Sequence, residues 1–385
     1  MRLALLNGQI LSGDQLVANR GVLIDGGRIL ELVAADDPRL SGVEKYDLHG
    51  QLLLPGFLDT QVNGGGGVLF NDEPSVAAVA KIGSAHRRFG TTGFLPTLIS
   101  DDLDVVARAI AAVRDAVDAG VPGVLGIHIE GPFLNAARRG VHDRAKLREL
   151  GADAVELLTS LGRGTTLVTL APEVTTPAII RQLTEAGVVV SAGHTDATYA
   201  EIAAALSHGL RGFTHLFNAM SQLTGREPGA VGAALESDSS WCGIIVDGRH
   251  VDPVVLRIAL RCKRHDRFML VTDAMPSVGA RRKSFTLQGR TIRVAGDVCV
   301  DEDGTLAGSN TDMASAVRNA TSMLNVPLAE AVRMASQYPA EFLGLGHQLG
   351  RIAPGYRANF VLADEELNVL ETWIDGRASK ESPAL

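Results

Sequence analysis

Two histidines stand at equivalent places in neighbouring segments of the chain. The apolar run 188–190 leads into His194, and the short run 212–214 leads into His215. A helical pattern at residues 199–209 separates them, which predicts a strand–helix–strand unit with both imidazoles at the carboxyl ends of parallel strands. Two neutral imidazoles in such a place suit a transition metal. The alternative is that both are structural or solvated.

A carboxylate could complete that pair of histidines. The strand-like run 124–130 ends in Glu130, and His128 lies two residues earlier, on the same face of the strand. Two histidines and one glutamate with an open position are the ligands of a catalytic zinc site. The alternative for Glu130 is an ion pair with a neighbouring arginine. His128 is expected deeper in the fold, as an interior hydrogen-bonding residue rather than a ligand.

A second carboxylate, Asp273, follows the apolar run 268–272. An acid at the mouth of a barrel can take a proton from metal-bound water and pass it to a leaving nitrogen. The alternative is a helix N-cap, a position that Asp favours. The sequence that follows, Ala274-Met275-Pro276, does not begin a good helix, which weakens that alternative.

Further polar side chains stand in loops after predicted strands. Arg226 lies in a loop that contains Gly and Pro, and His250 follows the seventh strand. Together they could bind an anion, since Arg makes bidentate contacts to phosphate. Solvated loop charges are the alternative. Among the other histidines, His142 stands in a loop, while His86 is expected at a surface or capping position.

Eight strand-like runs with helical patterns between them would position these groups. They lie near residues 52–60, 93–97, 124–130, 166–171, 188–191, 212–215, 243–246 and 268–273. This alternation predicts an α/β fold, a (β/α)8 TIM barrel. An open doubly wound sheet would usually carry a Gly-rich dinucleotide turn after its first strand. Residues 64–67 are glycines without a helical pattern behind them, so they are expected to form a site loop.

Both ends of the chain have β-like patterns. Residues 1–54 are expected to form the first part of a small β-sandwich, and residues 347–385 its second part and a tail. The barrel is expected to occupy residues 55–346. Within it, residues 284–306 read as an inserted β-hairpin region after the eighth strand.

The composition limits the classes of function. The net charge of −8 over 385 residues disfavours nucleic acid and acidic membrane surfaces as partners. The three cysteines, Cys242, Cys262 and Cys299, form no CxxC motif and are typical of reduced thiols in a cytoplasmic protein. The N-terminal apolar run is too short for a secretory leader. No apolar stretch is long enough to span a bilayer.

Several short motifs are spread over nearly the whole chain: QVNGGGG (61–67), HIEGPF (128–133), GHTDA (193–197), THLFNAM (214–220), DGRH (247–250), TDAM (272–275) and LAGS (306–309). In combination they resemble the N-acetylglucosamine-6-phosphate deacetylase family of the amidohydrolase superfamily. The departures are small: Val141 stands where Ala is usual before His142, and residues 64–67 are unbroken glycine.

The resemblance implies a (β/α)8 barrel with a small β-sandwich, and hydrolysis of N-acetyl-D-glucosamine 6-phosphate to D-glucosamine 6-phosphate and acetate. It implies that Glu130, His194 and His215 hold the metal, and that metal-activated water attacks with Asp273 as general acid and base. It assigns substrate binding to Val141, His142, Asn218, Ala219, Arg226, His250, Leu306, Ala307 and Gly308. It also implies a homodimer in which Arg226 and His250 can reach a neighbour's site.

The first strand bears on the number of metals. Many amidohydrolases bind a first metal through an HxH motif there, whereas this chain has Gln61 and Asn63. Amide oxygens are weak zinc ligands, so one divalent metal per chain is expected, Zn2+ first, with Fe2+, Co2+, Mn2+ or Cd2+ able to substitute. Gln61 and Asn63 are expected to hydrogen-bond the metal's water or the substrate.

Two other functions are the alternatives. An N-acyl amino acid deacetylase or a cyclic amidase commonly needs HxH on strand one or a carboxylated Lys on strand four, and residues 166–171 contain no Lys. A non-catalytic sugar-phosphate sensor on a barrel scaffold is the other alternative. The retained Asp273 and the full ligand set argue against it.

Overall fold

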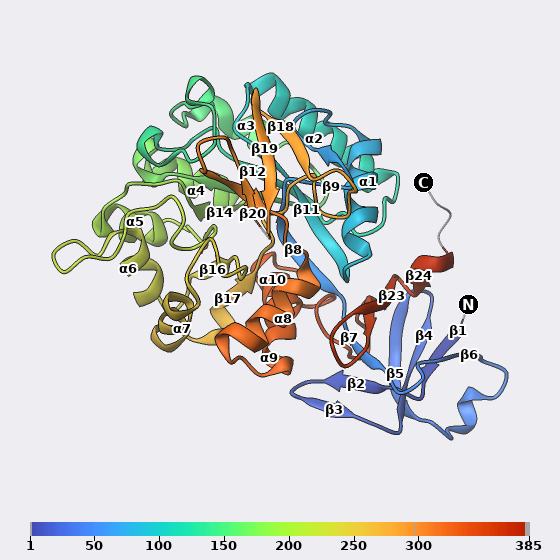
Figure 1. Ribbon diagram of the computed structural model, residues 1–385. Coiled ribbons are helices and arrows are strands. Elements are labelled where there is room, and N and C mark those ends of the chain that lie inside the picture. The colour runs from blue at the N-terminus through green and yellow to red at the C-terminus, as the bar shows by residue number, and fades with distance from the viewer. Residues whose placement is uncertain (1, 297, 382–385) are drawn as a thin grey trace.

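The centre of the molecule is a parallel eight-stranded sheet nearly closed into a barrel (Figure 1). The computed structural model describes residues 2–296 and 298–381. Its barrel strands are β8 (Phe57–Val62), β11 (Thr91–Ile99), β12 (Gly126–Glu130), β13 (Thr165–Leu170), β14 (Val189–Ala192), β15 (Gly212–Phe213), β16 (Trp241–Ile244) and β17 (Phe268–Leu270). The predicted (β/α)8 barrel is thereby confirmed.

Helices surround this sheet and connect its strands. They are α1 (Val76–Arg87), α2 (Leu103–Asp118), α3 (Val155–Leu158), α4 (Pro177–Glu185), α5 (Tyr199–Ser207), α6 (Gly229–Glu236), α7 (Pro253–Cys262), α8 (Met313–Leu324), α9 (Leu328–Ala335) and α10 (Gln337–Phe342). The helix between the two histidine loops, α5, begins with a capping box in which Thr198 and Glu201 satisfy each other's backbone N–H groups. Among the described residues, no helix has the length and apolar composition needed to cross a bilayer.

Both chain ends meet in a small sandwich, as predicted. One sheet contains β1 (Arg2–Leu6), β4 (Arg20–Asp25), β5 (Arg28–Ala34) and β6 (Glu44–Asp47). The other contains β2 (Gln9–Ser12), β3 (Gln15–Val17), β7 (Leu52–Pro55), β22 (Phe360–Ala363), β23 (Val369–Ile374) and β24 (Arg377–Ala378). Leu5, Ile10, Leu53, Phe360 and Trp373 are buried between them. This core joins residues that are more than 300 positions apart in the sequence.

The predicted strand at residues 52–60 is two strands in the structure. Its first half, β7, pairs with β2 and β22 in the sandwich, while β8 begins the barrel. The break falls at Gly56, where a Cβ atom would collide with the side chain of Thr92. The close approach of the Thr92 side chain therefore requires glycine here, and the apolar pattern, which continues through the break, did not reveal it.

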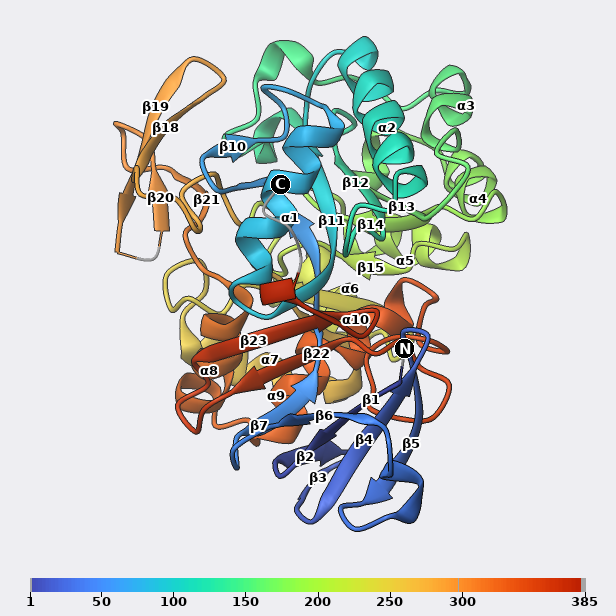
Figure 2. The ribbon, with the colours of Figure 1, turned by 90° about the vertical axis from the view of Figure 1, so that its right-hand side faces the viewer.

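A second small sheet follows the eighth barrel strand, in the predicted insertion. It consists of β18 (Ser284–Leu287), β19 (Arg290–Ala295), β20 (Val298–Val300) and β21 (Leu306–Ser309). Figure 2 shows it away from the sandwich, on another side of the barrel. Leu287, Ile292 and Cys299 pack with Ile99 and Met275 at the barrel mouth. The expected glycine loop, in turn, forms a tight hairpin of β9 (Gly64–Gly65) and β10 (Val68–Leu69).

The barrel has a seam between β8 and β17, the two end strands of the hydrogen-bonded order. Across this seam, Val62 of β8 forms an isolated bridge with Ala274, which lies four residues after β17. The backbone N–H groups of Asn63 and Gly64 both donate to the carbonyl oxygen of Ala274, at 2.9 and 3.0 Å. The seam therefore lies directly below the loops that carry Asn63 and Asp273.

Candidate metal centre and active-site cavity

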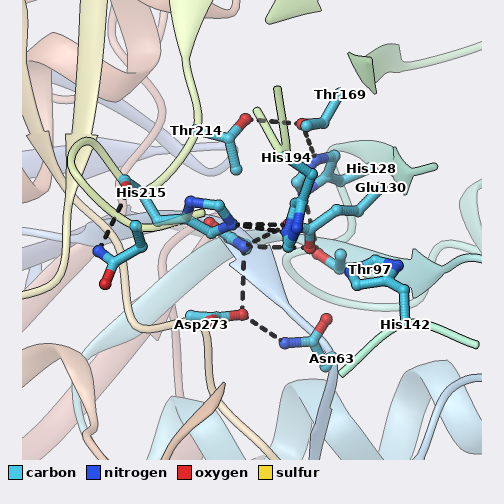
Figure 3. A network of polar contacts seen from close by, with 12 residues as sticks. Asn63, Thr97, His128, Glu130, His142, Thr169, His194, Thr214, His215 and Asp273 are labelled. Carbon is cyan, nitrogen blue, oxygen red and sulfur yellow. Dashed lines mark hydrogen bonds and ion pairs between the residues drawn. The ribbon is translucent and has the colours of Figure 1, made fainter. Parts of the chain in front are cut away.

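Four side chains predicted to do chemistry converge at the carboxyl ends of the barrel strands. Glu130 is the last residue of β12, and His194, His215 and Asp273 follow β14, β15 and β17 by two or three residues. All four lie close together in Figure 3. A parallel barrel brings the ends of all its strands to one face, so residues far apart in the sequence meet there.

Glu130, His194 and His215 form a compact cluster. Their ligand atoms lie within 4.8 Å of one another. The Nε2 atoms of the two histidines are 3.0 Å apart, and they lie 3.2 and 3.0 Å from Oε1 of Glu130. All three side chains are buried. Within the described residues, this is the one group of three or more His, Cys, Asp or Glu side chains with such a spacing.

The cluster has the chemistry of a cation site. Nδ1 of His194 lies 2.8 Å from the carbonyl oxygen of Arg138, so it carries the proton and leaves a lone pair on Nε2. Burial opposes ionisation of Glu130, yet its close contacts with the rings of His194 and His215 hold the pKa of its carboxyl well below the usual value. Two imidazole nitrogens and an ionised carboxylate are the ligands that a catalytic divalent metal requires.

Three of these residues have an uncommon backbone conformation. The φ angles of His194, His215 and Asp273 are 49°, 34° and 51°, in the left-handed region that residues other than Gly rarely adopt. Such conformations cost about 1–3 kcal/mol each and persist where the surrounding structure fixes them. The loops are thus held in shapes that turn three side chains towards one point.

Asp273 lies beside the cluster and is held by two amides. Its Oδ1 accepts hydrogen bonds from Nδ2 of Asn63 at 2.6 Å and from Nε2 of Gln61 at 3.1 Å. Nε2 of Gln61 also lies 3.2 and 3.1 Å from the two oxygens of Glu130. Burial, followed by the negative charge of Glu130, raises the pKa of Asp273 to about 6. A carboxyl with such a pKa can accept and return a proton near neutral pH.

His142 presents a neutral ring to the same space. The backbone N–H of Ser100 donates to its Nδ1 at 3.3 Å, and the Ser100 hydroxyl lies 2.7 Å from the same atom. Nδ1 is therefore the acceptor, and Nε2 carries the proton. Burial, together with the nearby His194, lowers the pKa of His142 to about 3. The side chain is thus a neutral N–H donor, suited to a carbonyl oxygen that gains negative charge.

Comparison with known proteins gives the family. The model of the amidohydrolase family matches residues 52–378. The chain belongs to the amidohydrolase family. A Shewanella relative, named an N-acetylgalactosamine-6-phosphate deacetylase, is 46% identical over 86% of this chain and 84% of its own. A Haemophilus influenzae relative, named an N-acetylglucosamine-6-phosphate deacetylase, is 36% identical over 98% and 99%. The crystal structure of N-acetylglucosamine-6-phosphate deacetylase from Pasteurella multocida superposes with a TM-score of 0.94, at 35% identity over 98% of this chain and 100% of that one.

The amidohydrolase has a cavity of about 400 Å³ over the cluster, a size typical of small-molecule sites. The predicted residues that line it are Asn63, Glu130, Val141, His142, His194, His215, Asn218, Ala219, His250, Asp273, Leu306, Ala307 and Gly308. Gln61 does not line the cavity itself, but its Nε2 contacts Glu130 and Asp273, which do. Arg226 lies on an exposed loop and does not line the cavity of its own chain.

His250 is oriented by a buried acid. Its Nδ1 lies 2.6 Å from Oδ2 of Asp247, whose Oδ1 accepts the backbone N–H groups of Arg249 and His250, both at 2.8 Å. Although burial opposes it, the hydrogen bond with His250 lowers the pKa of Asp247. With Nδ1 engaged in this way, Nε2 is the atom left to contact a ligand in the cavity.

The interior position expected for His128 is the one observed. Its Nδ1 lies 3.2 Å from the hydroxyl of Thr97 and its Nε2 2.7 Å from that of Thr169, which in turn contacts Thr214 at 2.6 Å. Figure 3 shows this chain of contacts behind the cluster. Burial lowers the pKa of His128 to about 4. Both ring nitrogens are engaged, so His128 supports the cluster without joining it.

Several residues of the site could not be predicted from the sequence. Arg138 orients His194 through its carbonyl, Ser100 sets the tautomer of His142, and Leu287 reaches the cavity from the inserted sheet. Their roles arise from backbone atoms or tertiary packing, which no motif displays. His86 was expected at the surface or in a cap, and this was wrong. It is buried, because it lies on the apolar stripe of α1, and its Nε2 lies 2.9 Å from the carbonyl oxygen of Gly64.

Proposed function

We propose that the protein hydrolyses N-acetyl-D-glucosamine 6-phosphate to D-glucosamine 6-phosphate and acetate. The observation that carries this proposal is the meeting of a three-ligand cluster, the neutral donor His142 and the carboxyl of Asp273 in one cavity. The relatives from Haemophilus influenzae and Pasteurella multocida bear the name of this activity and match almost the whole chain. We place the reaction in the cytoplasm, as a step of amino sugar catabolism.

Each residue has a role in the proposed reaction. A divalent metal held by Glu130, His194 and His215 would act as a Lewis acid and lower the pKa of water from about 15.7 towards about 7. Asp273 takes the proton of the attacking water, because it lines the cavity and its pKa is close to neutral. His142 donates its Nε2–H to the acetamide oxygen as negative charge develops there. Asp273 then returns the proton to the departing amine.

The amide side chains of Gln61 and Asn63, at the end of the first barrel strand, agree with a single metal. Gln61 and Asn63 present their NH2 groups to the carboxylates of Glu130 and Asp273. Because these NH2 groups donate to Glu130 and Asp273, the amide oxygens of Gln61 and Asn63 point away from the two carboxylates. We therefore assign one metal to each chain and take Zn2+ as its identity, since Zn2+ prefers nitrogen and carboxylate ligands in four-coordinate sites.

The 6-phosphate requires an unpaired cation, and among the described residues no Lys or Arg without an acidic partner lines the cavity. His250 lines the cavity, and Arg138, which also does, has its guanidinium paired with Asp196 at 2.8 Å. Arg226 is exposed and outside its own cavity. We infer that the protein forms a homodimer in which Arg226 of one chain joins His250 of the other at the 6-phosphate. A bidentate Arg contact is well suited to that group.

The 4-epimer, N-acetyl-D-galactosamine 6-phosphate, is the second candidate substrate. The Shewanella relative carries that activity in its name and is 46% identical to this chain. The two sugars share the acetamide and phosphate groups, so the mechanism above applies to both. The test is acetate release from the two 6-phosphates measured side by side. A ratio of kcat/KM in favour of the glucosamine derivative supports the first assignment, and the reverse ratio supports the second.

A further inference from the structure

Asp59 is a buried carboxyl inside the barrel, outside the set of residues that face the cavity. It lies on β8, two residues before Gln61, and its side chain is 1% exposed. Its Oδ2 accepts the hydroxyl of Thr272 at 2.5 Å, and its Oδ1 accepts the backbone N–H of Thr272 at 3.3 Å and that of Gln61 at 3.2 Å. One side chain thus binds both strands of the barrel seam.

At the seam, the Asp59 carboxylate accepts a backbone N–H group that a neighbouring strand would accept elsewhere in the sheet. β8 and the residues after β17 are joined by the isolated bridge of Val62 and Ala274, so the backbone N–H of Thr272 has to find an acceptor other than a neighbouring strand. Buried N–H groups without an acceptor are costly. Asp59 supplies that acceptor, immediately before the chain turns into the left-handed conformation of Asp273.

The contacts form a closed ring through the catalytic groups. Asp59 holds the backbone of Gln61 and of Thr272, and the side chain of Gln61 donates to Oδ1 of Asp273, the next residue after Thr272. A fourth contact comes from the inserted sheet, since the hydroxyl of Ser309 donates to the carbonyl oxygen of Thr272 at 2.5 Å. A shift of Thr272 therefore moves Asp273 relative to Gln61.

We propose that Asp59 is a positioning residue that closes the barrel seam and fixes the carboxyl of Asp273 for proton transfer. Its energetic cost agrees with a role in geometry rather than in stability. Burial raises the pKa of Asp59 to about 7, and the hydrogen bonds from Thr272 and Gln61 offset this rise only in part. An apolar or amide side chain would be cheaper to bury. The activity measurements below rest on the proposed deacetylase function, while the structural measurement does not.

The test compares two variants with matched controls. In Asp59→Asn, an NH2 group takes the place of Oδ2, the acceptor of the Thr272 hydroxyl, and in Thr272→Val that hydroxyl is removed. Thr272→Ser keeps the hydroxyl that donates to Asp59 and serves as the conservative rescue. Glu371→Gln alters another buried carboxylate, which accepts the N–H of Thr372, the N–H of Ser379 and the Ser379 hydroxyl in the sandwich. For each purified, metal-loaded variant, kcat, KM, bound metal and Tm are measured.

A misplacement of about 1 Å at reacting groups can cost about 100-fold in rate. We expect Asp59→Asn and Thr272→Val to lose about 100-fold in kcat, with KM within about twofold and a full metal content. Thr272→Ser and Glu371→Gln should keep wild-type kcat, whatever their Tm. A wild-type kcat in both Asp59→Asn and Thr272→Val would overturn the proposal. A loss in Glu371→Gln as large as that in Asp59→Asn would also overturn it, because both losses would then be general effects of lost stability.

A crystallographic comparison separates this proposal from the assigned reaction. If the wild type releases no acetate, the proposed function fails, but the structures of wild type and Asp59→Asn still decide the role of Asp59. We expect the contact between Gln61 Nε2 and Asp273 Oδ1 to be broken in the variant. An Asp273 carboxyl that keeps its wild-type position would overturn the positioning role.

Discussion

Replacement of Asp273 by asparagine removes the proposed acid and base while it preserves shape. In the wild type, Oδ1 accepts from Asn63 and Gln61, so the asparagine can keep its carbonyl oxygen on these two donors. Its NH2 group then occupies the position of Oδ2, the second oxygen of a side chain that lines the cavity. An amide there can neither take a proton from water nor return one to the amine. The local fold is expected to survive, because both amide donors keep their acceptor.

The size of the effect follows from that loss. General acid–base catalysis by a positioned side chain contributes about 10²–10⁴-fold, and Asp273 acts twice in the proposed reaction. We therefore expect kcat to fall by at least about 10³-fold, or about 4 kcal/mol of barrier. Metal content should stay at the wild-type level, since Glu130, His194 and His215 form the cluster without Asp273.

The assay is acetate release by Asp273→Asn under substrate saturation, with metal content measured on the same sample. Asp364→Asn is the matched control, since Asp364 holds Asn368 in a turn of the sandwich by accepting its N–H at 2.8 Å. The control should keep wild-type activity. Turnover within tenfold of wild type in metal-loaded Asp273→Asn would refute the assignment of this residue as acid and base.

The site leads to four further predictions. The active base is the carboxylate of Asp273, and burial raises its pKa to about 6, so kcat/KM should fall as pH drops through and below about 6. A bound cation favours the carboxylate and moves this fall to lower pH. A rate that instead rises with acidity would contradict the assignment. Arg226→Ala and His250→Ala should raise KM for the 6-phosphate more than they lower kcat, and unaltered discrimination against the unphosphorylated sugar would place the anion site elsewhere. Mixing Asp273→Asn with Arg226→Ala should restore some activity through heterodimers that contain one complete site, whereas no recovery would count against sharing. Dialysed protein should hold one tightly bound metal per chain by elemental analysis, and two equivalents, both needed for activity, would contradict the role given to Gln61 and Asn63.

The sequence was informative where chemistry and secondary structure coincide. The residues of the cluster could be found because each stands just past an apolar run, where parallel strands end. The same logic located Asp273 and the loops around His250. The eight strands were predictable from their β-branched and apolar composition, although the break at Gly56 was not, because the apolar pattern continues through it.

Other features depend on contacts between distant backbone atoms. The left-handed conformations of His194 and Asp273 carry no residue signature, since neither is Gly or Asn. The neutral tautomer of His142 depends on a backbone N–H of Ser100, 42 positions earlier. The burial of His86 follows from its place on the apolar face of α1, which depends on the exact position and phase of that helix. The position of Arg226 outside the cavity of its own chain depends on how its loop packs in the fold, which the sequence pattern does not show.

The most direct test of the account is acetate release from four compounds by the metal-loaded enzyme. They are N-acetyl-D-glucosamine 6-phosphate, its galacto epimer, and the two unphosphorylated sugars. We expect a 6-phosphate to be turned over with one acetate released per amine formed, a loss of activity on chelation, and recovery on addition of Zn2+. We expect the unphosphorylated sugars to react with a much higher KM. No acetate from either 6-phosphate, with the metal bound and the fold intact, would contradict the central claim.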